Sequence, residues 1–120
     1  MGQAVIEEEV AAAIEKAAGL AGKVYPLNAP EGEAMPFVVY VPSGTTEDDS
    51  LTGWLGSFDT GMEINVLHPS YKGMKTTAKA VVEALKGLSG AAVHIREEQP
   101  ELYEEEIGAY RKIIGLTLQH

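Results

Sequence analysis

The chain contains no cysteine, so it can form neither a disulfide nor a thiolate metal site. It also lacks any apolar run close to the ~20 residues that a membrane helix needs. The N-terminus, MGQAVIEEEV, does not have the basic-then-apolar order of a signal peptide. These absences predict a protein that is made in the cytosol and does not associate with a membrane.

Basic residues are scarce, with 9 Lys and Arg against 18 Asp and Glu and a net charge of −9. This balance disfavours specific nucleic-acid binding, because affinity for phosphate comes from Lys and Arg. Residues 70–88 are the exception. Four lysines (Lys72, Lys75, Lys79 and Lys86) and one glutamate (Glu83) give this segment +3, which leaves −12 for the rest of the −9 total.

Signatures of catalysis are also missing. The sequence has no GxGxxG, GxxxxGK[ST] or GxSxG motif, and His68, His94 and His120 do not have metal-ligand spacing. The run Glu47–Asp49 allows a solvated acidic loop or an adventitious cation site, but an EF-hand needs a closing Glu where this chain has Phe58. We therefore expect no enzyme activity, no metal and no cofactor.

Hydrophobic periodicity predicts two helices. Residues 4–20 place Ile6, Val10, Ala13, Ile14 and Ala17 on one face. A second helix is predicted within 70–88, with Ser70 as its N-cap. Its broad apolar stripe comprises Tyr71, Met74, Ala78, Val81, Val82, Leu85 and Leu88.

Alternating and β-branched runs predict strands at 37–41, 58–67, 91–96 and 110–118, and 23–25 is a candidate short edge strand. The acidic stretch after residue 96 is predicted as a turn. The expected fold is one α+β domain spanning residues 1–120, in the order α-β-β-α-β-β. It has a mainly antiparallel four-stranded sheet with two helices packed on one face.

A long loop is expected between the first two main strands, and it contains an acidic run and two large apolar residues. These loop residues are Glu47, Asp48, Asp49, Leu51 and Trp54. Two interpretations stay open for Trp54: it anchors a partner, as tryptophan does at binding hot spots, or it folds back as a lid on its own core. The helix lysines likewise either dock a partner or keep a helix surface solvated.

Three stretches together resemble the tail-completion proteins of tailed bacteriophages, which join head and tail. They are KVYPLNAPEGEAMPFVVYV (23–41), FDTGMEINVLHPSYKGMKTTAKAVVEALKGL (58–88) and LYEEEIGAYRKIIGLTL (102–118). The resemblance covers most of the chain after residue 22 and includes no catalytic motif. The segment TTEDDSLTGWLG is not part of it.

The resemblance implies a structural virion protein of a phage or prophage, made in the host cytoplasm. Subunits of this kind form a ring, commonly of six copies, between the tail tube and the head connector. The interface candidates are Glu47, Asp48, Asp49, Leu51 and Trp54 on the loop, and Lys72, Lys75 and Lys79 on the helix. The alternatives are a small ligand-binding or enzymatic domain with a site under the 43–56 loop, or a bacterial protein-binding adaptor.

Overall fold

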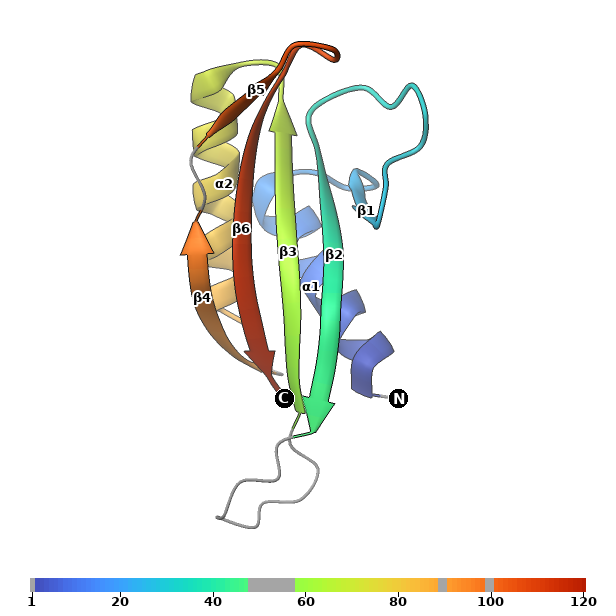
Figure 1. The fold of residues 1–120 in the computed structure, drawn as a ribbon, viewed down its shortest axis with the longest axis vertical. Coiled ribbons are helices and arrows are strands. Elements are labelled where there is room, and N and C mark those ends of the chain that lie inside the picture. The colour runs from blue at the N-terminus through green and yellow to red at the C-terminus, as the bar shows by residue number, and fades with distance from the viewer. Residues whose placement is uncertain (1, 48–57, 89–90, 99–100) are drawn as a thin grey trace.

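The computed structural model describes residues 2–47, 58–88, 91–98 and 101–120 (Figure 1). The two helices are α1 (Gly2–Ala18) and α2 (Tyr71–Lys86). The strands are β1 (Val24–Pro26), β2 (Phe37–Glu47), β3 (Phe58–His68), β4 (Ala92–Glu98), β5 (Leu102–Glu104) and β6 (Ala109–Gln119).

All six strands form one sheet in the order β1-β2-β3-β6-β4, and β5 also pairs with β6. β1 runs parallel to β2, whereas every other pair is antiparallel. Both helices lie on the same side of the sheet, behind the strands in Figure 1, with α1 near the β1 edge and α2 near the β4 edge. The predicted α+β class and the helices on one face are therefore confirmed.

The predicted four-stranded sheet and the predicted element order are wrong, because the sheet includes two further strands of three residues each. The candidate edge strand at 23–25 is present as β1 (Val24–Pro26), whereas β5 is not among the predicted strands. β5 lies in the acidic segment expected to be a turn, where Leu102–Glu104 pairs with Arg111–Ala109. β1 pairs in parallel with residues 38–40 of β2, which makes the sheet mixed. Segments of three residues carry almost no periodicity, so only their neighbours in the sheet define them.

The connection between β2 and β3 is shorter than expected, because β2 continues past Pro42. A bulge between Pro42 and Gly44 shifts the register, and Gly44 has a φ of 122° that favours glycine. Pairing then resumes as far as Glu47 with Phe58. The connection is reduced to residues 48–57, which lie outside the described residues.

The core fills the space between the sheet and the helices. Ile64 on β3 is flanked in register by Tyr40 on β2 and Ile114 on β6, and the Ile64 and Ile114 side chains are inaccessible to solvent. From α1, the predicted stripe is confirmed for Ile6, Val10 and Ile14, but Ala17 is exposed. The other buried hydrophobic members of this core are Leu20, Val24, Val38, Met62, Val66, Ala78, Val81, Leu85, Leu116 and Leu118.

The start of α2 is defined by local hydrogen bonds that confirm Ser70 as its N-cap. The Ser70 Oγ accepts a hydrogen bond from the backbone N–H of Gly73 at 3.0 Å. The Ser70 backbone N–H in turn donates to Nδ1 of His68 at 3.0 Å. Met74, Ala78, Val81 and Leu85 are buried as predicted, whereas Tyr71 is 47% exposed and does not belong to the buried stripe.

Candidate protein-interaction surfaces

A charged groove of about 540 Å³ lies between α2 and the strands β4 and β6. Lys75 and Lys79, two of the predicted interface residues, line it together with Lys86, whereas the third predicted lysine, Lys72, is exposed outside the groove. The remaining lining residues are Met74, Thr76, Ala78, Val82, Glu83, Glu98, Glu101 and Lys112. The structure therefore places two of the three predicted lysines in one concave surface.

Glu101 is the centre of an ion-pair network at one end of this groove. Its carboxylate accepts hydrogen bonds from Lys112 Nζ at 2.9 Å and from Tyr71 OH at 3.1 Å, and Lys75 Nζ lies 3.5 Å away. The hydrogen bond from Lys112, followed by that from Tyr71, lowers the pKa of Glu101 to about 2. The carboxylate in turn raises the pKa of Lys75.

This network determines which of the predicted lysines are free to bind a partner. Lys75 is already paired within its own chain. Lys79 and Lys86, by contrast, form no ion pair with any side chain in the described ranges. They are the lysines of the groove that are available to an external anion.

An aromatic cluster lies at the end of the sheet where β3 leads into α2. The ring of Tyr110 is 5.8 Å from that of Tyr71 and 4.8 Å from that of Tyr103, measured between centroids. Tyr103 is 54% exposed, and Leu102 and Ile107 in the same β5–β6 hairpin are 45% and 52% exposed. Exposed large hydrophobic side chains are typical of interaction surfaces, so this end of the sheet is a candidate for one.

Sequence reasoning missed this cluster. Tyr71 was assigned to the buried stripe of the helix, and Tyr103 to an acidic turn. The sequence did contain one signal for it. Leu102 and Tyr103 are two large apolar residues among glutamates, and a solvated turn does not need apolar side chains. Tyr71, Tyr103 and Tyr110 meet only because β5 and the start of α2 both lie beside the same end of β6.

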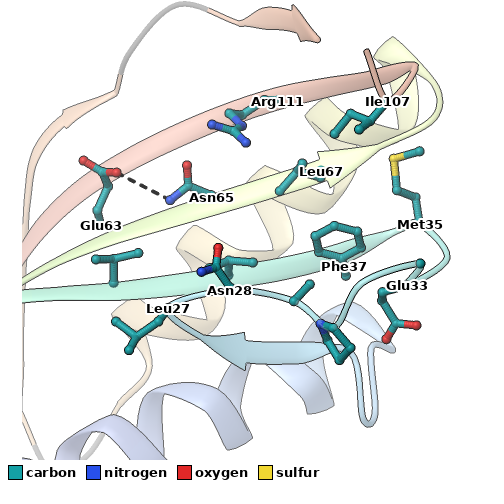
Figure 2. Close-up of a pocket in the computed structure, with 15 residues that line it drawn as sticks. Leu27, Asn28, Glu33, Met35, Phe37, Glu63, Asn65, Leu67, Ile107 and Arg111 are labelled. Atoms are coloured by element: carbon teal, nitrogen blue, oxygen red, sulfur yellow. Dashed lines mark hydrogen bonds between the residues drawn. The ribbon is translucent and has the colours of Figure 1, made fainter. Parts of the chain in front are cut away.

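A second concavity, of about 650 Å³, lies on the sheet face away from the helices (Figure 2). Phe37 and Leu67 form part of its apolar lining, and the loop from Leu27 to Met35 closes one side. The polar lining includes Arg111 and Asn65, and Asn65 donates a hydrogen bond to Glu63 at 3.5 Å. The remaining lining residues are Asn28, Ala29, Pro30, Gly32, Glu33, Val39, Val41 and Ile107.

Most of the predicted acidic loop cannot be placed. Asp48, Asp49, Leu51 and Trp54 lie outside the described residues, and of Glu47 only the backbone, paired with Phe58, is described. Neither concavity is lined by described residues of the 43–56 segment. The two interpretations of Trp54, partner anchor and lid, both stay predictions.

The histidines have separate surroundings. His68 accepts a hydrogen bond from the Ser70 backbone, and His120 Nε2 lies 2.7 Å from Thr60 Oγ1. His94 is exposed on β4. Within residues 2–47, 58–88, 91–98 and 101–120, no three His, Cys, Asp or Glu side chains are grouped so that they could hold a metal ion. No helix in those ranges is long and apolar enough to cross a membrane.

Together these features define an α+β subunit that has a charged groove at one sheet edge and exposed aromatic side chains at one sheet end. A family model described as "Tail completion protein gp17" matches residues 8–104. Because this match spans well over half of the 120 residues, the chain belongs to the tail completion protein gp17 family. It is therefore a bacteriophage structural protein, as the resemblance predicted.

The fold is similar to that of a chain in a solved structure described as the virion of a native gene transfer agent (GTA) particle. That chain has 19% sequence identity and a TM-score of 0.61, and the match covers 88% of this chain and 82% of that chain. At this identity the similarity is one of fold. No curated protein sequence matches this chain.

Proposed function

We propose that this protein is the ring-forming tail-completion subunit that joins the tail tube to the head connector of a phage or prophage. The family match over residues 8–104 carries this proposal. In this role the protein is part of the virion after its synthesis in the host cytoplasm, acts without catalysis, and contacts copies of itself as well as tail and connector proteins. The similar chain in a gene transfer agent virion supports a position in the assembled particle.

The shape of the fold suits a subunit with two different partners. The β2–β3 hairpin reaches Glu47 and Phe58 at one end of the sheet. The tyrosine cluster lies at the opposite end, because Tyr110 pairs with His68 at the other end of β3. In a ring whose axis follows the strands, one end faces the tail tube and the other the connector.

Removal of the protein from the particle tests the function directly. In a phage that encodes this chain, deletion of its gene should leave filled heads and complete tails that are not joined, visible by electron microscopy. Expression of the wild-type chain in trans should restore joined, infectious particles. Deletion particles with heads and tails still joined would refute the proposal.

The tyrosine end of the sheet can be tested by substitution. Replacing both Tyr71 and Tyr103 by alanine should abolish the rescue of infectivity, because Tyr103 is 54% and Tyr71 47% exposed and both are available to a partner. The matched control is Leu27→Ala, since Leu27 is 63% exposed but lies on the loop beside the sheet face. Full rescue by the double tyrosine variant would remove this end of the sheet from the proposed interface.

Trp54→Ala distinguishes the two interpretations of the connecting segment. If Trp54 anchors a partner, the variant should keep its free energy of unfolding and lose joining of heads and tails. A loss of about 3 kcal/mol or more in the free energy of unfolding, as for a core aromatic, would instead identify Trp54 as a lid on its own core.

A further inference from the structure

The two opposite edges of the sheet differ in charge on their helix side. The groove at the β4 edge is lined by Lys75, Lys79, Lys86 and Lys112 and by Glu83, Glu98 and Glu101, which leaves a net charge of +1. At the β4 edge, Lys79 and Lys86 project from α2 into the charged groove. They form no ion pair with the described part of the chain. The half-buried Val82 adds an apolar component to the groove.

At the other edge, α1 presents glutamates beside β2. Glu8 of α1 is exposed and Glu7 is half-buried, and after burial the charges of Glu7, Glu8 and Glu15 raise the pKa of Tyr40 on β2. α1 also contacts β1 and lies behind the β1–β2 edge in Figure 1. Glu15 accepts a hydrogen bond from the Gly22 backbone, but Glu7 and Glu8 have no ion-pair partner among the described side chains.

Within one copy these charges form no ion pair with each other. α1 and α2 pack against one another. The half-buried residues of α2 off the groove side are Gly73, Thr77, Ala80 and Ala84, none of which is charged. Lys79 and Lys86 thus lie on the β4 side of α2, whereas Glu7 and Glu8 belong to the helix near the β1–β2 edge.

We infer that a second copy of this chain docks head-to-tail on the α2–β4 groove, with Glu7 and Glu8 of its α1 facing Lys79 and Lys86. This inference rests on the proposed ring and names its subunit interface. A contact between two different surfaces of identical subunits repeats from copy to copy and closes into a ring when the rotation allows. Opposite charge at the two surfaces also opposes face-to-face pairing, which would bring like charges together.

The contact is made by side chains and not by an extended sheet. Pro42 has no backbone N–H to donate, and the bulge between Pro42 and Gly44 distorts the free part of the β2 edge. β4 has its own register shift between Ile95 and Glu97. Both edges are therefore poor templates for pairing with another strand.

Charge reversal with rescue tests the interface. Glu7→Lys/Glu8→Lys and Lys79→Glu/Lys86→Glu should each weaken self-association about tenfold or more, measured by sedimentation velocity, because like charges then face each other. An equal mixture of the two variants should associate as the wild type does, since every contact in an alternating assembly is again between opposite charges. Rescue in the mixture also shows that both variants fold.

Matched variants control for net charge. Glu105→Lys/Glu106→Lys changes two exposed glutamates in the β5–β6 turn, and Lys16→Glu/Lys72→Glu changes two exposed lysines outside the groove. Both should associate as the wild type does. Equal weakening by the control and the interface variants, or no recovery in the mixture, would overturn the proposed interface.

Crosslinking gives a second readout that also detects weak association, and the absence of native cysteine makes it specific. The double variant Glu8→Cys/Lys79→Cys, treated with a short bismaleimide, should give a ladder of covalent oligomers. A mixture of the two single variants should stop at dimers. Dimers from Glu8→Cys alone would indicate a two-fold contact, and no ladder in either purified protein or assembled particles would also contradict the inference.

The same variants separate this interface from the function itself. If charge reversal leaves self-association unchanged but blocks head–tail joining, the groove binds another particle protein and the inference is wrong, although the proposed function holds. If particles without the chain are still joined, the proposed function fails whatever the crosslinking shows.

Discussion

Gly73 lies in the first turn of α2, where the side chain of His68 leaves no room for a Cβ. Replacing Gly73 by alanine therefore tests the geometry of the helix start. A Cβ at Gly73 would overlap the imidazole ring of His68. That ring has a structural role, because Nδ1 of His68 accepts a hydrogen bond from the Ser70 backbone N–H at 3.0 Å and lies 3.3 Å from Ser70 Oγ. Gly73→Ala therefore has to displace His68 and break these contacts.

Two opposing effects set the magnitude for Gly73→Ala. Alanine favours a helix over glycine by up to about 1 kcal/mol. Each hydrogen bond lost when His68 moves costs about 0.5–1.5 kcal/mol net, and the overlap adds to this. We expect the variant to lose about 1 kcal/mol from a total free energy of unfolding of about 5–15 kcal/mol.

The sign of the effect should reverse once the imidazole is removed. In a His68→Ala background the imidazole no longer overlaps a Cβ at residue 73, so Gly73→Ala should stabilise the protein by up to about 1 kcal/mol. The expected coupling between the two substitutions is thus about 2 kcal/mol, which is large for a double-mutant cycle.

Urea unfolding of the four proteins, followed by far-ultraviolet circular dichroism, measures this cycle. Unchanged m values would show that the substitutions change the free energy of unfolding without changing the compactness of the denatured state. A coupling below about 0.5 kcal/mol, the level expected of independent sites, would refute the placement of His68 against Gly73.

The remaining predictions concern the ion-pair network, the core and the helix cap. The pKa of Glu101 is lowered from 4.5 to about 2, so the ionised carboxylate stabilises the fold above pH 4.5, and this contribution is lost as the pH falls toward 2. The difference in free energy of unfolding between the wild type and Glu101→Gln should therefore shrink over that pH range, as measured by unfolding at a series of acidic pH values. Ile64→Ala, at a position inaccessible to solvent, should cost about 3 kcal/mol in urea unfolding, whereas Leu102→Ala, at a 45% exposed residue, should cost less than about 1 kcal/mol; equal costs would contradict the assigned core. Ser70→Ala should cost about 1 kcal/mol and Ser70→Asn far less, and a large loss in both variants would show that Ser70 acts through more than capping.

The elements that sequence reasoning predicted best are those with long and regular patterns. Ser70 followed by apolar residues at helical spacing predicted α2 closely. The alternation of Met62, Ile64 and Val66 predicted a strand at 58–67, and β3 ends one residue later, at His68. In both cases one face of the element meets the core, so burial imposes a period on the residues. Such a period is a local property that the chain displays before it folds.

Short or interrupted elements could be predicted only in part: the edge strand expected at 23–25 is present as β1 (Val24–Pro26), whereas β5 was not expected. β1 and β5 have three residues each, and their pairing partners on β2 and β6 define them. β2 was ended at Pro42, because proline cannot donate to a ladder, but a bulge at Gly44 lets the strand continue on the other side. Whether a strand survives such an interruption depends on a partner strand that is distant in sequence.

The candidate surfaces divide along the same line. Composition alone identified the lysine-rich segment, the acidic remainder and the absence of catalytic motifs, because these are counts and spacings along the chain. Only the tertiary structure showed that Lys75 is already paired with Glu101 and that Lys79 and Lys86 line a groove. It alone brought Tyr71, Tyr103 and Tyr110 together, since the direction in which a charge or ring points depends on elements far apart in sequence.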